Sequence, residues 1–167
     1  MAISKVKPLA AAVFILLSGV ARAEATLTIF GDATPQTAVV SDTRPVTVGV
    51  RFQSAQPGKV WGIRFFRGAT SRDGYAVKLF AANGSLLAAA KTWKDTCFVP
   101  CWEQVNFRSP VSLAANTAYV AAYYTPNGRY AADKFDLTSR SAGPLTIPES
   151  AAVGGNGLYT YSAGFPD

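Results

Sequence analysis

Apolar and polar residues alternate along several short stretches of this chain, and a period of two is typical of β-strands. The clearest stretch is Val46–Phe52, in which four apolar residues alternate with Thr47, Gly49 and Arg51. Further strands are predicted at 27–29, 61–65, 75–80, 86–92, 102–107, 118–125 and 158–161. Turn-forming residues separate these stretches, and the Asn83-Gly84 pair predicts a hairpin. The pattern therefore predicts an all-β fold, an antiparallel β-sandwich of jelly-roll-like type.

The same alternation predicts which side chains face the core. Trp61 shares its strand face with Ile63 and Phe65, so we expect it to be buried. Residues 110–116 and 130–153 lack the alternation and contain several prolines. We expect both segments to be connecting loops.

The first 23 residues have the pattern of a secretory signal peptide. Lys5 and Lys7 precede the apolar run Leu9–Val20, which is followed by Ala21-Arg22-Ala23, a small-x-small cleavage pattern. Cleavage is expected between Ala23 and Glu24. The apolar run is shorter than the roughly 20 residues that a membrane span needs. The sequence therefore predicts an exported protein, secreted or periplasmic, with no membrane span in its mature part.

Residues 24–167 have the length of one domain, and their charge is modest. Removing the leader takes away three of the 16 basic residues and none of the ten acidic ones, which leaves a net charge of +3. The remaining basic residues are scattered, whereas a nucleic-acid-binding protein concentrates them on one stripe. We therefore expect no nucleic-acid partner.

The chain has no histidine, which excludes a Ser-His-Asp triad and the commonest general base. Its acidic residues stand mostly in turns or near the termini, where Asp often caps the backbone. We therefore predict that the protein is not an enzyme and has no catalytic residues.

The two cysteines, Cys97 and Cys101, are separated by three residues. In an oxidising compartment such a pair predicts a structural disulfide. Two cysteines without any histidine do not supply the ligands of a zinc site. We expect no cofactor, with one alternative: Asp32, Asp42 and Asp133 could converge from separate loops on a structural calcium ion.

An ordered series of short motifs resembles a bacterial family, the "domain of unknown function 4082" family of exported proteins. The series covers about residues 26–165, and its motifs include Val48-Gly49-Val50-Arg51-Phe52, Gly62-Ile63-Arg64-Phe65-Phe66, Trp102-x-Gln104-Val105-x-Phe107, Pro126-Asn127-Gly128-x-Tyr130 and Gly154-Gly155-Asn156-Gly157-x-Tyr159. The resemblance implies a β-sandwich of the carbohydrate-binding-module type and no established catalytic residues.

This chain departs from the family pattern at two places. Thr47 stands where family members commonly have an acid, and the chain stops at Asp167, where members usually continue past Gly164-Phe165-Pro166 into a last strand. A missing strand would leave an open sheet edge that could accept a strand from a partner protein. The alternative is that the chain is a truncated domain.

Exposed aromatic rings stack on the apolar faces of sugars, and polar groups around them fix the orientation of the ligand. The candidates here are Trp93 and Trp102, which flank the disulfide loop, and Tyr130 and Tyr159, which follow Asn-Gly turns. The alternative role for each ring is ordinary packing. We therefore expect an exported non-catalytic module that binds a glycan or cell-surface polysaccharide. The alternative is a structural or adhesion protein that pairs with another chain through an incomplete sheet edge.

Overall fold

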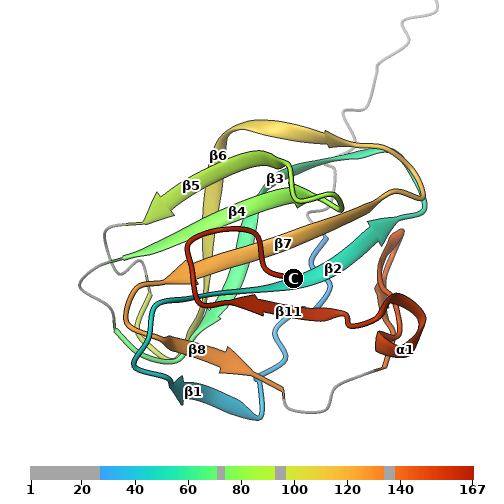
Figure 1. The fold of residues 1–167 in the computed structure, drawn as a ribbon. Helices are drawn as coiled ribbons and strands as arrows, with labels where there is room; N and C mark the ends of the chain where they lie inside the picture. Colours follow the sequence, from blue (N-terminus) through green and yellow to red (C-terminus); the bar gives the residue numbers. More distant parts are fainter. Residues whose placement is uncertain (1–26, 71–73, 93–96, 134–137) are drawn as a thin grey trace, which may run out of the picture.

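The computed structural model describes residues 27–70, 74–92, 97–133 and 138–167, and they form an antiparallel β-sandwich (Figure 1). The predicted leader, its cleavage position between Ala23 and Glu24, and Trp93 lie outside the described residues. Every strand pair within the described part is antiparallel. The all-β prediction is therefore confirmed.

The described residues contain strands in most of the predicted places and one helical turn. In chain order the elements are β1 (Thr37–Ser41), β2 (Val46–Ser54), β3 (Gly58–Arg67), β4 (Tyr75–Ala81), β5 (Leu86–Thr92), β6 (Cys101–Leu113), β7 (Ala118–Thr125), β8 (Arg129–Ala132), β9 (Arg140–Ala142), β10 (Leu145–Ile147), α1 (Ser150–Val153) and β11 (Gly157–Thr160).

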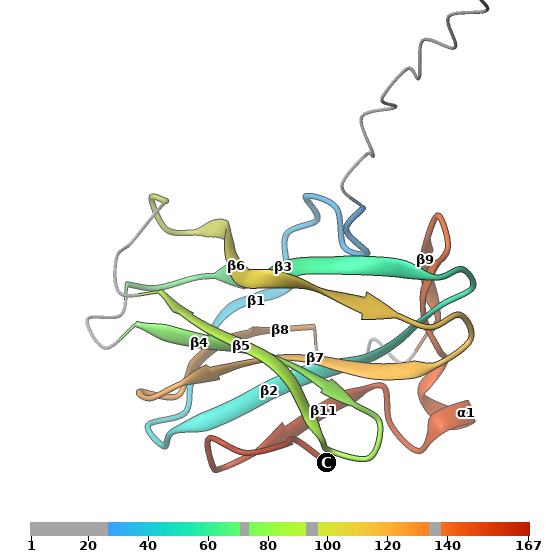
Figure 2. The same cartoon turned by 90° about the horizontal axis from the view of Figure 1, so that it is seen from above.

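The strands form two layers of unequal width, which Figure 2 shows one above the other. The larger sheet has the order β5-β4-β7-β2-β10-β9, and β11 also pairs with β2. The opposite layer contains the two-stranded sheet of β3 and β6, and β1 and β8 form a separate pair. The central ladder joins β2 to β7 from Val46↔Thr125 to Gln53↔Ala118. Among the described residues, the smaller sheet has two strands and is therefore too narrow to cover the whole of the larger sheet.

The main hydrophobic core lies between the two layers, as the alternation predicts. Its buried members are Phe52, Ile63, Phe65, Tyr75, Val77, Leu79, Val105, Phe107, Leu113, Tyr119 and Ile147. Their intervening residues face away from this core. Phe80, Val120, Ala122 and Leu158 form a second cluster on the other face of the larger sheet, where Phe165 packs against them. The C-terminal segment therefore covers part of that outer face (Figure 1).

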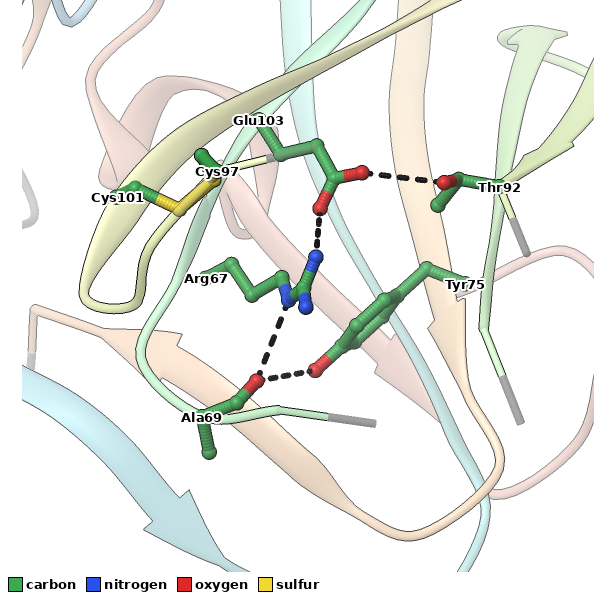
Figure 3. A network of polar contacts seen from close by, with 7 residues as sticks. All are labelled: Arg67, Ala69, Tyr75, Thr92, Cys97, Cys101 and Glu103. Atoms are coloured by element: carbon green, nitrogen blue, oxygen red, sulfur yellow. Dashed lines mark hydrogen bonds and ion pairs between the residues drawn. A yellow bond between two sulfur atoms is a disulfide. The ribbon is translucent and has the colours of Figure 1, made fainter. Parts of the chain in front are cut away.

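A polar network around a buried ion pair of the smaller sheet connects the two layers (Figure 3). Arg67 at the end of β3 donates to the carboxylate of Glu103 on β6, and the exposed fractions of the two side chains are 1% and 0%. Thr92 on β5 donates to the second carboxylate oxygen at 3.1 Å. The backbone oxygen of Ala69 accepts hydrogen bonds from Arg67 Nε and from the Tyr75 hydroxyl, each at 3.3 Å. One polar network thus joins β3, β4, β5 and β6.

The predicted disulfide between Cys97 and Cys101 is present beside this network, with a Cα–Cα distance of 6.2 Å (Figure 3). It closes the loop that leads into β6. Phe98 within this loop is fully exposed. The predicted pairing of the two cysteines is therefore confirmed.

The prediction that Trp61 is buried is wrong, because 59% of this residue is exposed. The pairing of β3 with β6 is irregular between Val60 and Gly62, and this irregularity changes the alternation of faces along β3. Beyond it, Ile63 and Phe65 return to the core. A bulge of this kind leaves no periodic signal in the sequence.

Three further boundaries differ from the predictions. No strand forms at 27–29; Ile29 packs against the core without joining a ladder, and the first strand is β1. The first four residues of the predicted connector at 110–116 belong to β6, which ends at Leu113. The predicted loop at 130–153 contains β9, β10, α1 and most of β8. These strands have only three or four residues, which is too short to show a period of two.

Candidate functional site

A cleft of about 390 Å³ is lined by residues of both layers. It is lined by four consecutive residues of β3 and by one residue of β6. Its lining residues are Phe30, Ala33, Pro35, Val48, Gly49, Val50, Ile63, Arg64, Phe65, Phe66, Trp102, Ala121, Ala122, Tyr123, Tyr130, Ala131, Ala132, Asp133, Thr138, Arg140, Ile147, Asn156, Gly157, Leu158 and Tyr159. This volume lies within the usual range of small-molecule sites.

The cleft exists because the smaller sheet leaves part of the larger one uncovered. Val48, Val50 and Phe52 occupy alternate positions on β2. Phe52 is buried in the main core, whereas Val48 and Val50 are only partly buried and line the cleft. Ala121 on the neighbouring strand β7 is also small and partly buried. This part of the cleft lining is therefore apolar.

Three of the four aromatic candidates predicted from the sequence line this cleft. Trp102 comes from β6, Tyr130 from β8 and Tyr159 from β11. Tyr159 is 60% exposed, and its ring meets that of Tyr161 edge to face at 5.8 Å. The structure thus brings together residues that are up to 57 positions apart in the sequence, Trp102 and Tyr159. The fourth candidate, Trp93, lies outside the described residues.

Trp102 is held in a fixed orientation at the cleft. Its indole Nε1–H donates to the backbone oxygen of Ala33 at 3.1 Å. Its ring stacks on Phe30 at 6.2 Å with an interplanar angle of 19°, and meets Phe66 edge to face at 5.5 Å. The guanidinium of Arg64 lies 4.9 Å from the centre of the ring. A ligand would therefore meet a ring that is already ordered, which reduces the entropy lost on binding.

Charged side chains stand at three points of the cleft lining. Arg64 donates to Asp32 Oδ1 and to the backbone oxygen of Gly31, both at 2.6 Å. Arg140 lies 5.6 Å from the ring centre of Phe30. Asp133 accepts a hydrogen bond from the backbone N–H of Gln36 at 2.5 Å. The lining therefore combines apolar rings with both donors and acceptors of hydrogen bonds.

Two tyrosine hydroxyls of the cleft have pKa values raised above the ordinary value of 10.0. Burial raises the pKa of Tyr123, whose hydroxyl accepts a hydrogen bond from the backbone N–H of Ala131 at 3.2 Å. Burial also raises the pKa of Tyr130, and the nearby Asp42 and Tyr159 add to the shift. Both hydroxyls can therefore donate or accept hydrogen bonds at physiological pH, but they do not act as bases.

The structure does not support the predicted calcium alternative. Asp32 pairs with Arg64, Asp42 accepts a hydrogen bond from Tyr161 at 2.6 Å, and Asp133 is bound to a backbone N–H. Among the residues that the structure describes, no three His, Cys, Asp or Glu side chains form a group that could hold a metal ion. Each of the three carboxylates has instead a local structural partner.

Sequence reasoning missed several residues of the cleft. Arg64 alternates with Ile63 and Phe65 on β3, so its position away from the core could have been read from the same periodicity. Phe30 and Arg140 lie in segments without a regular pattern, and no sequence signal places them in the cleft lining. Topology alone brings these distant segments together.

No helix in the described part of the chain is long and apolar enough to cross a membrane. A comparison with curated proteins finds no relative of this chain. A comparison with protein families gives a match over residues 32–167, which include the whole described sandwich from β1 to β11. The chain therefore belongs to the family described as "Domain of unknown function (DUF4082)".

Proposed function

We propose that the protein is a non-catalytic binding module whose cleft takes a short stretch of a glycan or cell-surface polysaccharide. The observation that carries this proposal is the convergence of Trp102, Tyr130 and Tyr159 from three different strands on one cleft. Sugar rings present apolar C–H faces that stack on such aromatic rings.

The polar residues of the cleft support the same ligand class. Sugar hydroxyls both donate and accept hydrogen bonds, and the lining offers the two kinds of partner in Arg64, Arg140 and Asp133. The neutral hydroxyl of Tyr130 adds a group that can do either.

The acids in the described part of the cleft lining favour binding over hydrolysis. Glycoside hydrolysis uses two carboxyl groups roughly 5–9.5 Å apart, one as acid and one as base or nucleophile. Among the described residues that line the cleft, Asp133 is the only carboxylic acid. We therefore propose that the glycan is bound and not cleaved.

The proposed place of action is outside the cytoplasm. The disulfide between Cys97 and Cys101 is typical of proteins that fold in an oxidising compartment. The signal-peptide pattern of residues 1–23 supports the same location. A periplasmic or secreted module would meet cell-surface polysaccharides directly.

The test is a pull-down with insoluble polysaccharides and titration with soluble glycans. We expect Tyr159→Ala to weaken binding about tenfold, because an exposed stacking ring is lost while the fold is left intact. Tyr159→Phe keeps the ring and should retain most of the affinity. The matched control is Trp61→Ala, which removes another exposed aromatic ring that does not line the cleft.

Failure of the folded protein to bind any polysaccharide or glycan would refute the proposal. So would glycan binding that Trp61→Ala removes and Tyr159→Ala leaves unchanged. In the second case the binding surface would lie on the exposed side of β3 and not in the cleft.

A further inference from the structure

The chain contains three Asn-Gly pairs, and each of them stands next to a strand. The pairs are Asn83-Gly84, Asn127-Gly128 and Asn156-Gly157. Asparagine loses its side-chain amide most readily before glycine, because glycine has no side chain to shield its backbone nitrogen. The dipeptide is the same in all three places, so any difference in reactivity has to come from the fold.

Deamidation at an Asn-Gly pair requires only water as a reactant. The backbone nitrogen of the glycine attacks the side-chain amide carbon of the asparagine, and a new N–C bond closes a succinimide ring. The side-chain nitrogen leaves as ammonia and takes up the proton of the glycine N–H. Water then opens the ring at either carbonyl, which gives aspartate or isoaspartate. The reaction therefore depends on how freely the asparagine and the next peptide unit can move.

Asn83 lies at the tip of the hairpin between β4 and β5, and the residue is exposed. Its Oδ1 accepts a hydrogen bond from the backbone N–H of Ser85 at 3.0 Å. The N–H of Gly84 donates to the backbone oxygen of Ala81 at 3.0 Å, and this bond has to break before the nitrogen can attack. Local opening of a short exposed turn requires far less free energy than unfolding of the domain.

Asn156 is held much more firmly. It is only 6% exposed, and its side-chain amide donates to the backbone oxygen of Pro148 at 3.1 Å. Its own backbone oxygen accepts a hydrogen bond from the N–H of Arg51 at 2.8 Å. The next residue, Gly157, begins β11 and pairs with Val50 of β2. Attack at this pair would require the beginning of β11 to separate from the larger sheet.

Asn127 is also restrained by the fold. Its Oδ1 accepts a hydrogen bond at 2.8 Å from the hydroxyl of Thr125, a fully buried residue. The backbone oxygen of Gly128 accepts from the N–H of Asp42 at 3.1 Å. A methyl carbon added to Gly128 would lie 1.4 Å from the backbone oxygen of Asp42, so the two segments are in close contact. Attack at this pair would require them to move apart.

We propose that Asn83 is a deamidation site of the folded protein, at which aspartate and isoaspartate form while Asn127 and Asn156 stay intact. The exposed hairpin tip is the part of the three that opens without disturbing a strand pair or a buried residue. The reaction replaces a neutral amide by a carboxylate and so adds a negative charge to the turn.

Isoaspartate at this position would also disturb the C-terminal segment. It continues the backbone through the side-chain carbon and therefore lengthens the turn. The C-terminal segment runs beside the turn, where a methyl carbon added to Gly84 would lie 3.4 Å from Cδ1 of Phe165 (Figure 2). The ring of Phe165 in turn meets that of Phe80 edge to face at 5.3 Å. A longer turn therefore changes the contact that holds this segment on the outer face of the larger sheet.

The test is incubation of the purified protein at mildly alkaline pH, followed by peptide mass spectrometry. Deamidation changes the mass of a peptide by the difference between a hydroxyl and an amino group, so each pair is measured separately. In the folded protein we expect Asn83 to convert at least about tenfold faster than Asn127 or Asn156. In guanidinium chloride the three pairs should convert at similar rates, because the fold no longer distinguishes them.

Asn83→Gln removes the proposed site, since the longer side chain closes a less favourable ring. This variant should lose the acidic species that accumulates in the wild type on isoelectric focusing. The matched control is Asn106→Gln, which makes the same change at another exposed asparagine that precedes Phe107 and not a glycine. An Asn83 that stays intact in the folded protein would overturn the proposal. Conversion of Asn127 or Asn156 as fast as that of Asn83 would also overturn it.

Hydrogen–deuterium exchange measures the effect on the C-terminal segment. The acidic species is separated from the unmodified protein by ion exchange, and the two forms are compared. We expect faster exchange in residues 162–167 of the acidic form, whereas the peptide that contains β7 should exchange equally in both. Equal exchange of residues 162–167 in the two forms would overturn the link between the turn and Phe165.

Discussion

The buried ion pair of Arg67 and Glu103 gives the sharpest prediction about stability. Glu103→Gln keeps the size of the side chain and an oxygen that can accept from Thr92, but it removes the negative charge that faces Arg67. The buried guanidinium would then lose the carboxylate charge of Glu103. Breaking a buried pair in this way typically costs about 3–5 kcal/mol.

Such a loss is large compared with the total stability of a domain of this size, which is about 5–15 kcal/mol. Urea denaturation followed by circular dichroism measures it. With a slope of about 2 kcal/mol per molar urea, the midpoint should fall by roughly 1.5–2.5 M. The control is Asp32→Asn, which breaks the pair with Arg64 at a carboxylate that is mostly exposed. We expect that change to leave the midpoint nearly unchanged.

The double variant Arg67→Met with Glu103→Leu separates the cost of an unpaired charge from the contribution of the pair itself. Replacing both ions by apolar residues of similar size is often close to neutral. The double variant should therefore be more stable than Glu103→Gln alone. The reasoning is refuted if the free energy of unfolding of Glu103→Gln lies within about 1 kcal/mol of the wild-type value. It is also refuted if the double variant has the same free energy of unfolding as Glu103→Gln.

Three other changes have defined outcomes. Gly128→Ala should destabilise the connection between β7 and β8, because Gly128 has φ of +67° and an added methyl carbon would lie 1.4 Å from the backbone oxygen of Asp42; thermal melting measures this. The hydrogen bond from Tyr161 is the main cause that lowers the pKa of Asp42 in the folded protein. The ionised Asp42 therefore stabilises the fold fully at pH values above the ordinary pKa of about 3.8. This contribution is lost as the pH falls through the lower pKa of the folded state. The melting temperature of Asp42→Asn should therefore approach that of the wild type below this range, and a constant difference from pH 2 to 7 would contradict the assignment. The double change Cys97→Ser with Cys101→Ser should lower the free energy of unfolding by about 2 kcal/mol, and equal stability of the wild type in reducing and oxidising urea titrations would contradict it.

The sequence was sufficient to predict the long strands because their alternation reflects burial on one face. Val46–Phe52 and the stretch 118–125 are such cases, and the structure pairs them in one continuous register. The Asn83-Gly84 turn was equally informative because its backbone needs φ above zero, and Gly84 has φ of +86°. These features depend on local chemistry and therefore appear in the sequence itself.

The candidate site could be predicted only in part. The sequence indicates Trp102, Tyr130 and Tyr159 as separate candidates, since residues near turns and loops are frequent ligand contacts. Their convergence depends on β8 and β11, and β8 lies at the start of a segment where no strand was expected. The exposed position of Trp61 depends on one irregularity between β3 and β6, which only the pairing of distant residues can produce.

The indole of Trp102 also allows the cleft to be monitored by tryptophan fluorescence. Its ring contacts Phe30 and the guanidinium of Arg64, and its N–H donates to a backbone oxygen. A molecule that enters the cleft would therefore change the surroundings of this fluorophore. The chain has three tryptophans, and replacing Trp61 and Trp93 by Phe would leave Trp102 as the sole source of tryptophan emission. Occupancy of the cleft could then be followed as a shift in emission wavelength, without labelling either the protein or its ligand.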